Sequence, residues 1–200
     1  MAFLWPLPRI VGLIGPRRVG KDTLAQVLEA TEDYHPIALA TPLMTLGTTL
    51  WPSGFPRNAI TTLGAAVRSQ DPHALIAVVL RTIAASSSDQ RWVITDIRLP
   101  LEYATFRAAW GPDFAAIAIT ADPAVRAQRI AQSHRADGLQ ETPTSGNDVT
   151  ETWAATPPED VDGIWDTSDV PPTDPFSTWA FRLHHSVWWT HHPLQRRPSS

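Results

Sequence analysis

The feature that most constrains the fold of this chain is an apolar run followed by a loop that two glycines bound and a lysine ends. Ile10–Ile14 suits a buried parallel strand, and the residues after Lys21 place their apolar side chains on one helical face. Gly15 and Gly20 allow backbone angles that let successive N–H groups converge on a phosphate, while Lys21 supplies a positive charge. The stretch therefore predicts a strand, a phosphate-binding loop and a helix.

The loop matches the pattern G-x-x-x-x-G-K-[ST] except at its last position, where Asp22 stands and the hydroxyl follows as Thr23. Two interpretations of Asp22 are open: it holds magnesium directly or through water, or it caps the helix that starts there. Thr23 is either the displaced hydroxyl on the magnesium side or an ordinary first-turn residue. The predicted nucleotide-binding residues are Gly15, Arg18, Gly20, Lys21, Asp22 and Thr23.

Length and composition favour one compact domain. The 200 residues are 43% hydrophobic, which suffices for a core, and we expect a single domain over residues 1–190 with a flexible tail at 191–200. The formal net charge of −4 does not favour broad adhesion to nucleic acid. There is no cysteine, no apolar run long enough for a membrane span and no convincing signal peptide, so we expect a cytoplasmic protein without membrane partners.

Strand and helix patterns alternate along the chain. Strands are expected at 10–14, 35–40, 91–96, 114–120 and 163–166, and helices at 43–50, 58–68, 73–85, 99–110, 123–134, 149–155 and 175–189. Loops are expected at 51–56, as a mobile cover, and at 136–147. The alternation predicts an α/β fold with three α/β/α layers around a mostly parallel five-stranded sheet.

Polar residues follow the expected strands at the sheet edge where ligands gather. Asp96 ends the third strand, and Arg98 follows it. Asp96 is interpreted either as a magnesium-side or orienting carboxylate or as a cap for the helix that begins at Leu99. Arg98 either binds an acceptor phosphate with two hydrogen bonds or pairs with Asp96 or Glu102 to hold the loop.

Further basic residues are candidates for substrate contacts. Arg68 ends a helix at a place where a second substrate could bind. Arg126 and Arg129 share a helix face, which indicates either a solvated basic surface or, together with Arg135, a lid over about residues 126–148 that closes charge onto a phosphoryl group. Zinc is not predicted, because adjacent histidine pairs on a helix do not converge on one ion: His184, His185, His191 and His192.

Four segments together resemble the phage-type deoxynucleoside monophosphate kinases, within the P-loop nucleoside monophosphate kinases. They are Gly20-Lys21-Asp22-Thr23; Ala38–Leu43, which is similar to "FADPL"; Leu63–Arg68; and Ile94–Glu102, which is similar to "ITDVRFPNE". Their order and spacing match over about residues 9–152. Three positions depart from the family pattern, because Thr41 stands at an acidic position, Leu101 replaces asparagine and Asp148 replaces histidine.

The resemblance implies ATP as phosphoryl donor, Mg²⁺, and a deoxynucleoside monophosphate as acceptor. It implies that Arg68 and Arg98 lie near the acceptor and that Asp96 lies near the reacting centre. The predicted substrate-binding residues are Arg68, Arg98 and Glu102. It also implies an α/β P-loop kinase fold with a mobile lid and a mobile acceptor-binding segment.

We therefore expect an ATP-dependent enzyme that transfers the γ-phosphoryl group to the 5′-phosphate of a deoxynucleoside monophosphate. The predicted catalytic residues are Lys21, Asp96, Arg129 and Arg135, and the predicted metal-side residues are Asp22 and Thr23. Two alternatives remain open. One is a kinase for a small phosphorylated metabolite or a modified base in DNA, and the other is a non-catalytic nucleotide-binding module. Assembly as a homodimer is compatible with the sequence.

Overall fold

The computed structural model describes residues 8–54, 57–137, 153–156 and 158–170, with Thr178 and Trp188–Trp189. Its sheet contains β1 (Ile10–Ile14), β2 (Tyr34–Ile37), β3 (Arg91–Ile97), β4 (Phe114–Thr120), β5 (Gly163–Asp166) and β6 (Trp188–Trp189). The strand order is β2-β3-β1-β4-β5-β6. Strands β1 to β5 pair in parallel, and β6 joins β5 antiparallel. The predicted five-stranded parallel arrangement is confirmed, with one short strand added.

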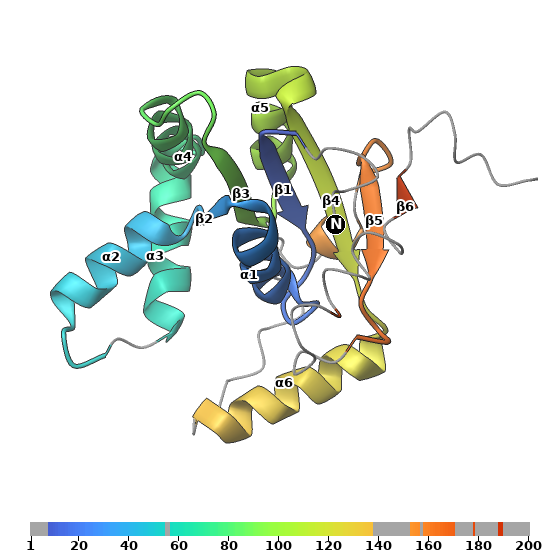
Figure 1. The fold of residues 1–200 in the computed structure, drawn as a ribbon. Coiled ribbons are helices and arrows are strands. Elements are labelled where there is room, and N and C mark those ends of the chain that lie inside the picture. The colour runs from blue at the N-terminus through green and yellow to red at the C-terminus, as the bar shows by residue number, and fades with distance from the viewer. Residues whose placement is uncertain are drawn as a thin grey trace, which may run out of the picture.

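Helices cover both faces of this sheet (Figure 1). They are α1 (Lys21–Glu32), α2 (Thr41–Leu50), α3 (Arg57–Gln70), α4 (Ala74–Ala84), α5 (Pro100–Trp110) and α6 (Pro123–Asp137), with a short 3₁₀ helix η1 (Gly111–Asp113). In Figure 1, α1 lies in front of the sheet, α4 and α5 lie behind it, and α6 runs across the carboxyl ends of the strands. Within the described residues, no helix combines the length and the apolar character that crossing a membrane requires.

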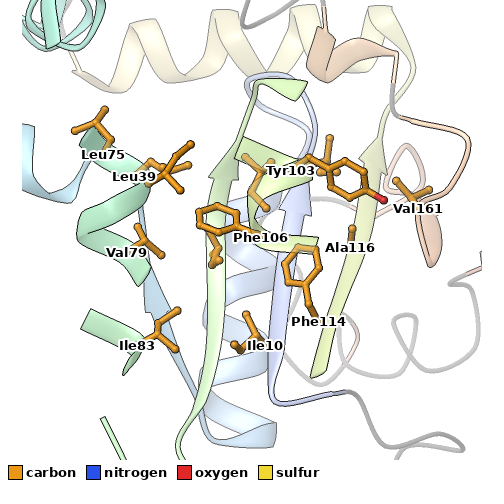
Figure 2. Packing of buried hydrophobic residues seen from close by; sticks show 14 of the residues in the cluster. Ile10, Leu39, Leu75, Val79, Ile83, Tyr103, Phe106, Phe114, Ala116 and Val161 are labelled. Carbon is orange, nitrogen blue, oxygen red and sulfur yellow. The ribbon is translucent and has the colours of Figure 1, made fainter. Parts of the chain in front are cut away.

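The alternating side chains of the strands build two separate cores. On β1, Val11 and Leu13 face the core that α1 covers, together with Leu24 and Leu28 of that helix. Ile10 and Ile14 face the opposite core. Figure 2 shows this second core, in which Leu75, Val79 and Ile83 of α4 and Phe106 of α5 pack over the strands. The three-layer architecture predicted from the sequence is therefore observed.

The centre of β1 is packed too tightly for a side chain. A Cβ atom built on Gly12 would lie 2.5 Å from Cδ1 of Ile97 and 2.7 Å from Cζ of Phe114. Contacts this short do not occur between real side-chain atoms, so the neighbours would have to move. The lack of a side chain at Gly12 lets Ile97 of β3 and Phe114 of β4 pack closely on β1, and β1 leads directly into the predicted phosphate-binding loop.

Three boundaries differ from the sequence prediction. The second strand ends at Ile37, and its Pro36 is tolerated because β2 is the edge strand of the sheet. Helix α6 continues to Asp137, into the segment predicted as a loop. The terminal helix predicted over 175–189 is wrong at Trp188–Trp189, because these residues pair with β5 and extend the sheet. The predicted segments at 138–152 lie outside the described residues, as do 171–177 and 179–187.

Candidate functional site

The loop between β1 and α1 has the backbone geometry of a phosphate-binding loop. Arg18 and Gly20 have φ angles of 63° and 100°, in the left-handed region that turns successive N–H groups toward one side. A Cβ on Gly15 would overlap the backbone oxygen of Ile119 on β4, so only glycine fits at the start of the loop. The loop ends where the N–H of Leu24 donates to the oxygen of Gly20 at 2.9 Å and α1 begins.

Lys21 lies under this loop. Its side chain is 5% exposed, and Nζ donates hydrogen bonds to the backbone oxygens of Gly15 and Pro16, both at 2.7 Å. The ammonium group also interacts electrostatically with the carboxylate of Asp96. The positive charge of Lys21 therefore acts on both the loop and the end of β3, where the predicted donor and acceptor sides meet.

The structure bears on one of the two interpretations of Asp22, the capping role. The N-cap position of α1 is Gly20, no side chain caps the helix there, and Asp22 lies exposed in the first turn. A capping hydrogen bond from Asp22 is therefore not observed. Asp22 and the half-buried Thr23 both carry oxygen atoms, the ligand type that Mg²⁺ prefers. Within the described ranges, no three His, Cys, Asp or Glu side chains gather to hold a metal. An ion beside Asp22 and Thr23 would therefore also need oxygen atoms from a bound nucleotide or from water.

Asp96 is half-buried at the carboxyl end of the sheet. Its two carboxylate oxygens accept hydrogen bonds from the backbone N–H groups of Leu39, at 2.6 Å, and Ala40, at 3.1 Å. Burial raises the pKa of Asp96, and this rise is opposed by the N–H of Leu39, the charge of Arg98, the N–H of Ala40 and the charge of Lys21. Asp96 thus ties the segment between β2 and α2 to the end of β3.

Glu102, expected among the acceptor-binding residues, has a buried carboxylate directed at the backbone. It is 4% exposed, and Oε2 accepts hydrogen bonds from the N–H groups of Arg98, at 2.8 Å, and Leu99, at 3.0 Å. Burial raises the pKa of Glu102 to about 7; the charge of Asp96 adds to the rise, while the N–H groups of Arg98 and Leu99 and the charge of Arg68 oppose it. Glu102, rather than Asp96, therefore binds the N–H of Leu99, the N-cap residue of α5, and fixes the backbone that carries Arg98.

Arg68 reaches the same region from α3. Its guanidinium group lies beside Gly64, where an added Cβ would come within 3.3 Å of Nη2. Its charge acts on Glu102, and the charge of Glu102 in turn is coupled to that of Asp96. The predicted residues Lys21, Arg68, Asp96, Arg98 and Glu102 are therefore brought together at the carboxyl end of the sheet, from separate elements of the chain.

The arginines of α6 hold the phosphate-binding loop from outside. Nε of Arg126 donates to the oxygen of Arg17 at 3.2 Å, and Nη1 of Arg129 lies 3.4 Å from the oxygen of Arg18. Nη2 of Arg129 donates to the oxygens of Thr167, at 2.7 Å, and Val170, at 2.9 Å. The interpretation of a solvated basic face is wrong for Arg129, which is 8% exposed because these carbonyls enclose it. Its catalytic role stays a prediction, and the side chain of Arg135 lies outside the described residues.

Thr167 is a site residue that the sequence reasoning missed. It is fully buried, its hydroxyl donates to the oxygen of Val19 at 2.7 Å, and the same hydroxyl accepts from Nη1 of Arg129 at 3.1 Å. Burial lowers the pKa of Arg129, against the raising effect of the Asp166 charge. The sequence feature that could have identified Thr167 is its position, because it directly follows β5, at the sheet edge where ligands bind in such folds.

Comparisons with protein-family models and with curated protein sequences find no match. Solved structures do match along most of the chain. A candidate kinase from Chloroflexus aurantiacus J-10-fl has a TM-score of 0.55 at 19% identity, covering 89% of this chain and 96% of its own. A gluconokinase from Sinorhizobium meliloti 1021 has a TM-score of 0.52 at 14% identity, covering 87% of this chain and 88% of its own. The fold is that of the P-loop kinases. At these identities the likeness shows the P-loop kinase fold alone.

Proposed function

We propose that this protein transfers the γ-phosphoryl group of ATP to the 5′-phosphate of a deoxynucleoside monophosphate. The observation that carries the proposal is the convergence of cationic groups on Asp96. The charges of Lys21, from the predicted phosphate-binding loop, and of Arg98, which follows β3, both act on Asp96, and the charge of Arg68 acts on Glu102. A protein that brings two phosphate-bearing substrates together needs positive charge on both sides of the reacting atoms.

On the donor side, the loop residues 15–20 would receive the β- and γ-phosphates, and Lys21 would follow the charge as it develops. The ammonium group now donates to two carbonyls at 2.7 Å, and on nucleotide binding it would turn toward phosphate oxygens. Mg²⁺ would be held by the carboxylate of Asp22 and the hydroxyl of Thr23 with phosphate oxygens, where it would neutralise charge.

On the acceptor side, Arg68 and Arg98 would bind the phosphate of the acceptor. The resemblance of Leu63–Arg68 and Ile94–Glu102 to segments of deoxynucleoside monophosphate kinases supports this assignment. An acceptor phosphate is already a nucleophile at neutral pH, so the reaction needs no strong base. Asp96 would orient the reacting groups by holding the backbone of Leu39 and Ala40 at the mouth of the site.

The test is an acceptor panel with the purified protein, ATP and Mg²⁺. The panel contains the deoxynucleoside monophosphates, the ribonucleoside monophosphates and gluconate, and ADP production is followed against a reaction without acceptor. We expect ADP to form with at least one deoxynucleoside monophosphate. Turnover with gluconate alone would mean that the acceptor is a sugar acid and would contradict the proposal. ATP binding without turnover of any acceptor would support a non-catalytic nucleotide-binding module.

A further inference from the structure

The carbonyl groups of the phosphate-binding loop are held by side chains along its whole length. Lys21 binds the oxygens of Gly15 and Pro16. The next three oxygens, of Arg17, Arg18 and Val19, are bound by Arg126, Arg129 and Thr167 respectively. The first pair is held by a group that must reach the phosphates. The other three are held from α6 and from the loop after β5.

Because the peptide group is planar, the three contacts to carbonyl oxygens also orient the neighbouring N–H groups. In a trans peptide the carbonyl of one residue and the N–H of the next point in opposite directions. Hydrogen bonds that hold the oxygens of residues 17, 18 and 19 therefore also fix the N–H groups of Arg18, Val19 and Gly20. Those N–H groups belong to the segment with left-handed backbone angles at Arg18 and Gly20, where convergent donors can bind an anion.

We propose that Arg126, Arg129 and Thr167 are positioning residues that preset the loop N–H groups for phosphate before a nucleotide arrives. We call these three residues the carbonyl clamp. The inference rests on the proposed function in that the loop binds a nucleotide, and one part of its test uses the proposed acceptor. Without the clamp, the loop would have to be ordered at the expense of binding energy, so nucleotide affinity would fall.

The three contacts are unequal. The bond from Thr167 to Val19 is the shortest, at 2.7 Å, and both partners are buried. Arg126 makes a longer bond of 3.2 Å from a half-buried position, and the contact of Arg129 at 3.4 Å is the longest. Thr167 also receives a hydrogen bond from Arg129 at 3.1 Å, so its hydroxyl joins two members of the clamp. Thr167 is therefore the position at which the clamp is tested most sharply.

The experiment compares Thr167→Val with Thr167→Ser by titration calorimetry with ADP as the probe. Valine keeps the shape and removes the hydroxyl, and serine keeps the hydroxyl. We expect ADP affinity to fall by about tenfold in Thr167→Val and to stay within about threefold of wild type in Thr167→Ser. Thr82→Val is the matched control, because it removes an exposed hydroxyl that donates to the oxygen of Val78 within α4, at 2.9 Å. If Thr167→Val does not fold, Arg126→Gln supplies the test, with an expected loss of about threefold.

The binding of the acceptor deoxynucleoside monophosphate, titrated alone, separates a positioning role from a general structural one. A clamp predicts that Thr167→Val weakens ADP binding and leaves acceptor binding unchanged. Equal ADP affinity in Thr167→Val and wild type, or equal losses for ADP and acceptor, would overturn the clamp and leave the kinase proposal standing. Failure of the wild-type protein to bind ADP would overturn the nucleotide site and the clamp together.

Discussion

Nζ of Lys21 lies 2.7 Å from the backbone oxygen of Gly15, six residues earlier in the chain. The ammonium group is thus already positioned on the loop that it is proposed to serve, and it is buried there. Binding a nucleotide would exchange neutral carbonyl partners for charged phosphate oxygens, and charge-assisted bonds are the stronger ones. The resting contact holds the lysine in place without competing strongly with the ligand.

Replacing Lys21 tests its role in turnover. Lys21→Met should lower kcat by a factor of about 10² to 10³, because the transition-state charge loses a preorganised partner. Circular dichroism should show the fold retained, since methionine keeps the apolar stem. A kcat near the wild-type value would contradict the role assigned to Lys21.

The same residue offers a direct readout, because Lys21 is the only lysine in the chain. An amine-reactive reagent followed by peptide mass spectrometry reports the reactivity of this single side chain. We expect ATP to slow modification of Lys21, while the α-amino group reacts at the same rate and serves as the internal control. Equal rates with and without ATP would place the nucleotide elsewhere.

Two glycine substitutions should differ in their effects. Gly15→Ala forces Cβ onto the backbone oxygen of Ile119, which cannot rotate away, whereas Gly12→Ala meets side-chain atoms of Ile97 and Phe114. We expect Gly12→Ala to cost about 1 to 3 kcal/mol of stability and to keep nucleotide binding. Gly15→Ala should lose measurable ADP binding even in the folded fraction. Chemical denaturation and calorimetry give the two quantities, and normal ADP affinity in Gly15→Ala would refute the close-approach argument.

Much of the fold was predictable because periodicity reports local burial. Phe114–Ile119 is continuously apolar, and together with Thr120 it forms a strand with the predicted bounds. Gly15, Gly20 and Lys21 were identified by a motif whose chemistry is local. Trp188–Trp189 was misassigned, because pairing with β5 depends on a distant partner rather than on the local pattern.

The role of Thr167 was hidden for the same reason. A threonine after a strand is unremarkable in sequence, and only the folded chain brings its hydroxyl to Val19, 148 residues away. Arg129 illustrates the limit of helix-face arguments. Its spacing from Arg126 predicts that the two side chains share a helix face. The burial of the Arg129 side chain depends on Thr167 and Val170, in a loop that the spacing does not reveal.

Glu102 predicts a specific pH dependence of stability. Its pKa is raised from 4.5 to about 7 in the fold, so the folded state binds more protons than the unfolded state between these values. Stability should therefore fall as pH rises from about 4.5 to about 7, by at most about 3 kcal/mol from this group. Glu102→Gln keeps an acceptor oxygen and removes the titration, so its unfolding free energy should fall less over this range.

The control for Glu102 is Glu29→Gln, which changes an exposed glutamate on α1. Urea denaturation at several pH values gives the unfolding free energy of each protein. The wild type and Glu29→Gln should share one slope, and Glu102→Gln should differ from both. A common slope for all three proteins would contradict the assignment of a raised pKa to Glu102.

Arg68 should act on the acceptor and not on ATP. Arg68→Lys keeps the charge and removes the planar guanidinium, so we expect KM for the acceptor to rise by about tenfold while KM for ATP stays unchanged. Arg81→Lys, on the exposed side of α4, is the matched control. Steady-state kinetics with each substrate varied in turn measures the split. A rise in the KM for ATP instead would move Arg68 to the donor side.

The central claim is that one sheet edge brings a phosphoryl donor and a phosphate acceptor together. Its most direct measurement is transfer of label from γ-³²P-ATP to deoxynucleoside monophosphates, with the products separated by chromatography and Lys21→Met run in parallel. We predict labelled deoxynucleoside diphosphate in equal amount to the ADP formed, and almost none with Lys21→Met. Label released only as inorganic phosphate, or no loss of label from ATP with any deoxynucleoside monophosphate, would contradict the claim.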